Sequence, residues 1–186
     1  TYHASQVVST IGAYNLPNLL PFIDRKEMAS ISNLTYAPVI QASVGFKNTG
    51  TLRFNAFGGL VPSKEKKKIL GILFPSACFE GRAPEEGALF SFFMGGMKHQ
   101  DLLQKGDEEL INLIREELHL MLGFQKEIEP DLLKIFRHHR AIPQYELNSG
   151  KRFETIEKLE KQYPGLHIAG NLKGGIGMAD RIRQAT

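Results

Sequence analysis

Apolar residues change their spacing along the chain, and the change predicts a region of strands followed by a region richer in helices. Residues 6–10 contain two adjacent valines, and we interpret them as a short buried strand. The stretch 35–46 alternates and is rich in β-branched residues, which predicts a longer strand. Glycines and prolines separate the next apolar runs, as is typical of an antiparallel sheet, and further strands are expected at 52–57, 68–74 and 88–94.

A helical period begins near residue 107. Asp107 is the expected N-cap of this helix, and Gly123 is the residue expected to end it. Between them, one helical face gathers the apolar side chains of Leu110, Ile111, Ile114, Leu118, Met121 and Leu122.

The rest of the chain mixes the two periods. We expect a short strand at 132–136, a second amphipathic helix at 153–163, a buried strand at 166–170 and a closing helix from Ala179 onward. The pattern as a whole predicts an α+β fold with a long antiparallel stretch.

Composition narrows the function classes. The 186 residues are 42% hydrophobic and 23% charged, which is typical of a globular protein. The net charge is only +3, so no nucleic-acid partner is expected. The longest apolar run, 69–74, is far shorter than the roughly 20 residues of a membrane-spanning helix. The single cysteine, Cys78, cannot form a disulfide within the chain, which fits a reducing compartment, and we expect it to be a small core residue.

Candidate chemistry gathers near the C-terminus. Gly170-Asn171 and Gly174-Gly175-Ile176-Gly177 lie between a predicted strand and a predicted helix, with Asp180 near the helix start. Backbone N–H groups at a helix N-terminus attract electron-rich groups, and glycine lets a backbone approach a flat ligand closely. Taken alone, glycines between a strand and a helix more often form a turn without any ligand.

Other short segments occur in an order that resembles a known family. The end segment resembles the C-terminal FAD signature of the protoporphyrinogen oxidases, which belong to the wider flavin amine oxidase group. The resemblance runs from about residue 7 to residue 182 and rests on Phe57-Gly58-Gly59-Leu60-Val61-Pro62, on Leu70-Gly71, Ser76, Phe79 and Arg82-Ala83-Pro84, on Gly95-Gly96, on Ala141-Ile142-Pro143-Gln144-Tyr145, and on 168–182.

The chain departs from the family pattern at several points. Ala56 stands where the family usually has the first glycine of a GFG stretch, and 148–150 replace its usual Gly-His. His138 stands where many members carry an aromatic residue near the flavin. The family's dinucleotide-binding fingerprint, GxGxxG, occurs nowhere in the 186 residues.

The resemblance implies a two-domain organisation. Residues 1–33 and 141–186 are expected to be segments of a Rossmann-like FAD domain. Residues 34–140 are expected to be the second half of a substrate-binding domain, built on a mixed, mainly antiparallel sheet. We therefore expect the chain to be the C-terminal part of a longer enzyme, with an incomplete FAD site and no activity of its own.

The activity that the resemblance implies is the FAD-dependent oxidation of protoporphyrinogen IX to protoporphyrin IX in heme biosynthesis. O2 would be the acceptor and H2O2 the second product. Coproporphyrinogen III oxidation and another flavin amine oxidase-type reaction are the alternatives within the group. A non-catalytic binding fragment is the alternative from another class.

The resemblance also implies roles for individual residues. The flavin-binding candidates are Gly170, Asn171, Ile176, Gly177, Met178 and His138, and the substrate-binding candidates are Leu60 and Phe79. The plainer interpretations are a helix start without a ligand and two ordinary core residues. No catalytic side chain is required, because the cofactor performs the redox chemistry. No metal is expected, since His138 and His139 are adjacent and point to opposite faces of a strand.

The expected partners are a tetrapyrrole, O2 and further copies of the chain. An incomplete sheet with an open apolar edge favours self-association. A cytoplasmic location is expected, with peripheral contact to the inner membrane. The charge run 64–68 is interpreted as a solvated turn that could touch an anionic membrane, and Arg82 as a loop residue that could meet a substrate propionate.

Overall fold

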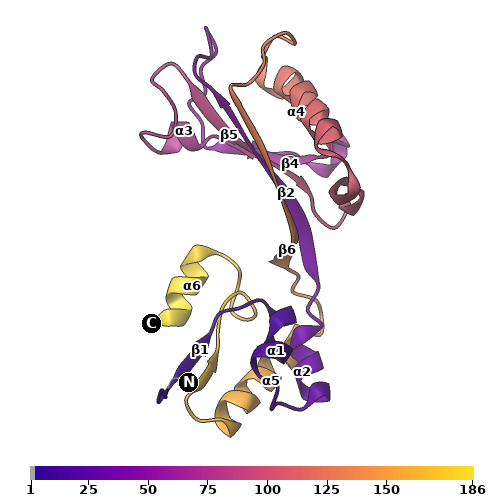
Figure 1. The fold of residues 1–186 in the computed structure, drawn as a ribbon, viewed down its shortest axis with the longest axis vertical. Coiled ribbons are helices and arrows are strands. Elements are labelled where there is room, and N and C mark those ends of the chain that lie inside the picture. The colour runs from indigo at the N-terminus through magenta and orange to yellow at the C-terminus, as the bar shows by residue number, and fades with distance from the viewer. Residues whose placement is uncertain (1–2) are drawn as a thin grey trace. The chain divides into compact units, whose positions relative to one another are not determined.

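The computed structural model describes residues 3–186, which form two compact units (Figure 1). One unit contains the chain up to Tyr36 together with Ile142–Thr186, and the other contains Ala37–Ala141. The second unit is thus one continuous segment inserted into the first. The chain enters it at the start of strand β2 (Tyr36–Phe46) and leaves it at the end of strand β6 (Leu132–Pro143).

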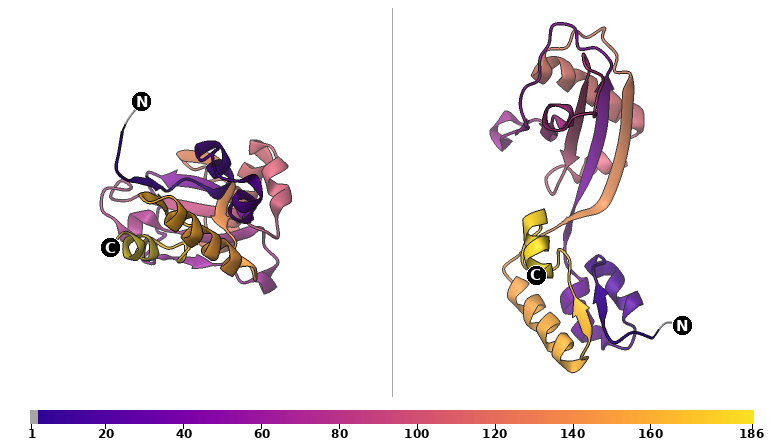
Figure 2. Two further views of the ribbon diagram at one scale, coloured as in Figure 1. Left: turned by 90° about the horizontal axis from the view of Figure 1, so that it is seen from below. Right: turned by 90° about the vertical axis from the view of Figure 1, so that its left-hand side faces the viewer.

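A five-stranded sheet forms the inserted unit. Its strand order is β3 (Gly58–Leu60), β4 (Ile69–Leu73), β5 (Ala88–Gly95), β2 and β6. The pairs β3–β4, β4–β5 and β5–β2 are antiparallel. Figure 2 shows β2 and β6 running side by side. The strands predicted at 35–46, 68–74 and 88–94 are therefore confirmed, as is the mainly antiparallel α+β fold.

The strand predicted at 52–57 is wrong. The chain there has no regular structure, and the nearest strand is β3 at Gly58–Leu60. The ring of Phe54 explains the difference, because it packs edge-on against Phe74 and Phe90 at centroid distances of 5.8 and 4.8 Å. Leu52 and Phe54 therefore pack against the core from a loop, whereas Phe57 is exposed, and tertiary packing overrides the strand-like pattern.

One face of the sheet is covered by helix α4 (Asp107–Leu122), as Figure 1 shows. Alternate residues of β5 are buried on this face, whereas Leu89, Ser91 and Phe93 between them are only half-buried. The ring of Phe124 stacks on that of Phe46 at 4.3 Å. The buried set on this face includes Ala88, Phe90, Phe92, Met94, Leu110, Ile114 and Leu118.

Only one of the two predicted ends of α4 is correct. Gly123 ends the helix at φ +77°, in the left-handed conformation that glycine adopts most readily. Gly106, and not Asp107, is the N-cap. Asp107 instead lies in the first turn and pairs with Arg137 at 2.5 Å, while the Glu109 carboxylate accepts a hydrogen bond from the Gly106 N–H at 3.3 Å.

Strand β6 is much longer than the strand predicted at 132–136. It continues to Pro143 through Arg137, His138, His139 and Arg140, which are polar. The side chains of His138, His139 and Arg140 are all exposed, so this part of the strand buries no face and the hydrophobic pattern does not reveal it.

The other unit packs short helices around a two-stranded parallel pair. Strand β1 (Val7–Ser9) pairs with β7 (Leu166–Ile168), in the register Val7 to Leu166. The helices α1 (Leu16–Leu19), α2 (Arg25–Ser32) and α5 (Ser149–Gln162) contribute buried residues to the core of this unit. That core consists of Ala13, Leu16, Leu20, Ile23, Met28, Ile31, Ile156, Leu159, Leu166, Ile168 and Leu172.

Two further differences concern short elements. Helix α5 begins four residues earlier than predicted, at Ser149, because its first turn contains a buried arginine that an apolar pattern does not show. Cys78 ends the short helix α3 (Pro75–Cys78) and is exposed, so the expectation of a core cysteine is wrong. Within residues 3–186, no helix is long and apolar enough to cross a membrane.

Replacing Phe90 by alanine tests the aromatic core. The side chain is fully buried, so Phe90→Ala should lower the free energy of unfolding by about 3–5 kcal/mol. Phe136→Ala serves as the control, since Phe136 is 45% exposed on β6 and its loss should cost less than about 1 kcal/mol. Urea unfolding followed by far-ultraviolet circular dichroism measures both variants. Equal costs for the two would contradict this description of the core.

Candidate functional site

The glycine-rich segment after β7 forms a loop with several positive φ angles. Gly170, Gly174 and Gly175 have φ of +96°, +75° and +103°. A side chain on Gly175 would collide with the carboxylate of Asp180, so that position requires glycine both for its backbone angle and for space. The loop ends at Gly177, the N-cap of helix α6 (Met178–Ala185), which confirms the closing helix.

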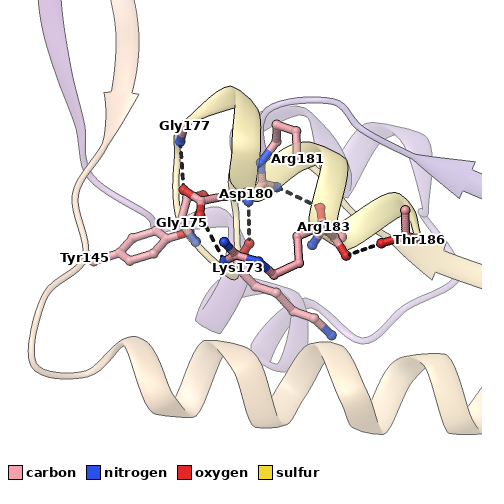
Figure 3. Close-up of polar contacts among 9 residues, drawn as sticks. Tyr145, Lys173, Gly175, Gly177, Asp180, Arg181, Arg183 and Thr186 are labelled. Atoms are coloured by element: carbon pink, nitrogen blue, oxygen red, sulfur yellow. Dashed lines mark hydrogen bonds and ion pairs between the residues drawn. The ribbon is translucent and has the colours of Figure 1, made fainter.

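Tyr145 holds this loop from one side, as the close-up in Figure 3 shows. Its hydroxyl accepts a hydrogen bond from the Gly175 N–H at 3.1 Å. It lies 3.0 Å from the Gly175 carbonyl oxygen and 3.2 Å from that of Asn171, and its single proton serves one of these acceptors at a time. One phenol group thus ties together two parts of the loop that are four residues apart.

Helix α6 holds the loop from the other side (Figure 3). The Arg181 guanidinium donates to the carbonyl oxygens of Lys173 at 2.9 Å and Gly175 at 2.7 Å. The Asp180 carboxylate accepts from the Gly177 N–H at 3.0 Å. The Gln184 side-chain oxygen accepts from the Gly170 N–H at 3.0 Å.

A buried arginine supports Tyr145. Arg152 on α5 is only 4% exposed and donates to the Leu172 carbonyl oxygen at 2.9 Å. Its guanidinium also lies 5.2 Å from the ring centroids of both Tyr145 and Phe153. Burial lowers the pKa of the Arg152 guanidinium below its usual range, and the nearby tyrosines and Glu146 oppose that change. The cation therefore connects the tyrosine ring to the loop backbone.

The surface that the loop leaves open is apolar. Ile176 is 52% exposed, Met178 83% and Ile182 65%. The carboxylate of Asp180 already occupies the Gly177 N–H at the start of α6 and would repel a phosphate there. This combination of exposed apolar side chains and an accessible backbone fits a flat, largely apolar ring system better than an anion.

The inserted unit carries a separate apolar hollow of about 210 Å³ on the sheet face opposite α4. It is lined by Leu60, Leu70, Gly71, Ile72, Leu73 and Phe93. Leu60 lies opposite Gly71 in the β3–β4 pair and is 86% exposed. A side chain at position 71 would meet Leu60 and the Gly59 carbonyl, so the glycine keeps this hollow open.

The structure brings some predicted site residues together and leaves others apart. The candidates Gly170, Asn171, Ile176, Gly177 and Met178 all lie in or beside the glycine loop. Leu60 lies in the hollow, but Phe79 does not line it. Phe79 instead follows α3, is 60% exposed and has the Arg82 guanidinium 5.9 Å from its ring centroid.

His138 lies on β6 in the inserted unit and is exposed, so its contact with a flavin stays a prediction. No cluster of three or more metal-binding side chains occurs in the described part of the chain.

Sequence reasoning missed Leu73, Phe93, Tyr145 and Arg152. Leu73 and Phe93 alternate with buried strand neighbours, and this alternation places them on the open face of the sheet. Tyr145 was part of a recognised motif, but its hydrogen bonds depend on a loop about 30 residues away in the sequence. The residue types and their spacing along the sequence do not reveal that contact.

Comparison with known proteins identifies the group to which these features belong. The model of the family "Flavin containing amine oxidoreductase" matches residues 1–179. The chain belongs to this family. The resemblance to the wider flavin amine oxidase group is thereby confirmed, and the family is one of flavin-containing oxidoreductases.

Individual relatives are similar over most of the chain. Protoporphyrinogen oxidase 2, chloroplastic/mitochondrial, of Arabidopsis thaliana is 32% identical over 82% of the chain and 30% of its own length. Coproporphyrinogen III oxidase of Bacillus subtilis is 23% identical over 84% of the chain and 33% of its own length. The chain thus spans about a third of the length of these relatives.

A solved structure shares the fold. A crystal structure from an Exiguobacterium species, provisionally described as a protoporphyrinogen oxidase, superposes with a TM-score of 0.76 at 22% identity. It covers 98% of this chain and 39% of the other. The fold of this chain is therefore one already seen in a solved structure.

Removing one hydroxyl group tests the role of Tyr145 in holding the loop. In Tyr145→Phe the Gly175 N–H loses its acceptor, so its amide hydrogen should exchange about fivefold faster, as expected for one lost hydrogen bond. Tyr163→Phe is the control, because that hydroxyl receives only a 3.3 Å contact from Gln162. Hydrogen exchange resolved by residue measures both. Unchanged exchange at Gly175 in Tyr145→Phe would show that the loop is held by other contacts.

Proposed function

We propose that the protein carrying this chain oxidises a porphyrinogen with FAD, and that protoporphyrinogen IX is its substrate. The observation that carries the proposal is the apolar hollow between Leu60 and Phe93 on an open sheet face, in a chain whose relatives include protoporphyrinogen oxidases. A porphyrinogen is a macrocycle of four pyrrole rings joined by saturated carbons, and such a hollow is suited to one of these rings.

The glycine loop fits the ring system of FAD. Asn171, Ile176, Gly177 and Met178 would face the flavin, with Gly170 allowing the backbone to turn at φ +96°. When bound, FAD would supply the two-electron oxidation that the reaction needs. Tyr145, Arg152 and Arg181 contact the loop backbone and hold its shape without needing to touch the cofactor.

The sheet face would position the substrate. Leu60 and Phe93 can contact a pyrrole ring from the hollow, and Leu73 lies beside them. Burial of Leu60, now 86% exposed, would stabilise the complex by roughly 1.5–3 kcal/mol. The hollow holds one ring and not a whole macrocycle, so the remaining rings must be bound by other surfaces.

Coproporphyrinogen III is the second candidate substrate. It is favoured by the similarity to the coproporphyrinogen III oxidase of Bacillus subtilis. The two substrates share the pyrrole rings that the apolar hollow would bind, and they differ in the number of carboxylate side chains. Only groups outside that hollow can therefore distinguish them.

The 186-residue chain alone would supply only part of the cofactor site. It contains no GxGxxG motif, which in FAD and NAD enzymes holds the pyrophosphate. We therefore expect the isolated chain to retain little FAD and to be inactive. We further propose that O2 is the electron acceptor and that H2O2 is released. The protein is also proposed to be cytoplasmic, to contact the membrane peripherally and to self-associate.

Flavin content and porphyrin formation test the proposal directly. The intact polypeptide that carries this chain should purify yellow, and porphyrin fluorescence should rise when it is mixed with protoporphyrinogen IX in air. The isolated chain should be colourless and inactive. An intact polypeptide that holds FAD yet oxidises neither protoporphyrinogen IX nor coproporphyrinogen III would refute the assigned substrate class.

Shortening Leu60 tests the substrate face. Leu60→Ala in the intact polypeptide should raise KM about tenfold and change kcat less, because the lost contact is made before and during the reaction. Leu147→Ala is the control, as Leu147 is fully exposed and outside the hollow. Steady-state kinetics with protoporphyrinogen IX measures both. An unchanged KM in Leu60→Ala would remove the hollow from the substrate site.

A further inference from the structure

A second hollow, of about 150 Å³, adjoins the apolar one and has a different chemistry. Its lining includes Ser63, Lys66, Lys67, Lys98 and His99, and no Asp or Glu contributes to it. It lies where β5 ends and β4 begins, and the Gly96 N–H there donates to the Pro38 carbonyl oxygen at 2.8 Å. The hollow is therefore a concentration of cationic side chains on the inserted unit.

The lysines of this hollow are not equivalent. Lys67 pairs with the buried carboxylate of Glu117 at 2.6 Å, so its charge is already balanced. Lys66 and Lys98 make no ion pair within residues 3–186. The Lys98 ammonium group donates to the Ser63 hydroxyl at 3.1 Å, which holds it beside the turn that carries Lys66. Two uncompensated cations thus share one concave surface.

Lys66 adopts a backbone conformation that lysine seldom takes. Its φ is +53°, the only positive φ of a non-glycine residue in the described part of the chain. Glycine or asparagine would fit this angle with less strain. Backbone preference therefore does not account for a lysine at this position, whereas a contribution of its side chain to the hollow does.

Leu70 joins the two hollows, since its side chain lines both of them. It lies in the irregular step of the β4–β5 pair, between Ile69 and Gly71, and is 36% exposed. A Cβ atom at position 96 would lie in ordinary contact with the Leu70 side chain, 3.5 Å from its Cδ1. A ligand with an apolar ring and a short acidic arm would find a complementary surface on either side of Leu70.

We propose that the hollow formed by Ser63, Lys66 and Lys98 is a carboxylate-binding subsite that receives an acidic side chain of the tetrapyrrole whose pyrrole ring occupies the Leu60–Phe93 hollow. This inference rests on the proposed function, because it takes the ring position from it. It goes further in naming the cations that would favour a substrate with a carboxylate on the bound ring.

Binding of two stable porphyrins to the intact polypeptide that carries this chain tests the subsite. Coproporphyrin III has free carboxylates, and its tetramethyl ester has none but keeps the same rings. The acid should bind the wild-type polypeptide more tightly than the ester, as measured by porphyrin fluorescence at neutral pH. Lys98→Gln should weaken binding of the acid about three- to tenfold and leave binding of the ester unchanged, as expected for one partly exposed charged contact.

Two variants control for charge and folding. Lys126→Gln removes a lysine beyond the C-terminal end of α4 and outside the hollow, and it should leave the acid's advantage intact. Lys66→Gly removes a side chain from a position with positive φ, so it should raise the midpoint of thermal unfolding while it weakens binding of the acid. Because its stability rises as the binding of the acid falls, unfolding cannot explain the loss.

The outcomes separate this inference from the proposed function. If acid and ester bind the wild-type polypeptide equally, or if Lys98→Gln weakens both alike, the carboxylate subsite is wrong and the apolar ring site stands. If neither compound binds, the ring position fails and the subsite fails with it. If Lys98→Gln reduces binding to phosphatidylglycerol vesicles but not to coproporphyrin III, the hollow contacts a membrane and the proposal is overturned. The proposal is supported only if Lys98→Gln and Lys66→Gly abolish the tighter binding of the acid while Lys126→Gln does not.

Discussion

The pairing of β2 with β5 is the interaction on which the inserted unit depends. Its register runs from Val39 opposite Gly95 to Phe46 opposite Ala88. Side chains on a strand alternate between the two faces, so this register places Phe90 and Phe92 in the core and Phe93 on the open face. A slip of one residue would exchange the faces, emptying the core and filling the hollow.

The glycine loop of the other unit depends on a different kind of restraint. Its backbone is held by side chains from three places in the sequence: Tyr145, Arg152 and the residues of α6. These contacts use loop carbonyl and N–H groups on one side and leave Ile176 and Met178 exposed on the other. A loop that is shaped before a ligand arrives loses less conformational freedom on binding, which favours affinity.

The sequence predicted the parts of the fold that repeat regularly. The alternation in 35–46 and the helical period in 107–122 identified β2 and α4, because each element buries one face against a single core. The loop with Phe54 and the polar end of β6 were missed, since the first is apolar without being a strand and the second is a strand without being apolar. Motif resemblance pointed to the glycine loop and Leu60 as candidates. It did not find Arg152 or Lys98, whose surroundings are assembled from segments far apart in the chain.

The insertion of one unit within the other has a consequence for how the chain folds as it is made. The inserted unit is continuous, so Ala37–Ala141 can complete its sheet and core as soon as those residues have left the ribosome. The parallel pair of β1 and β7 cannot form until Leu166 has been added opposite Val7. During that interval β1 lacks the contact with β7 that the complete unit provides. The order of synthesis thus makes the unit with the glycine loop the last to become native.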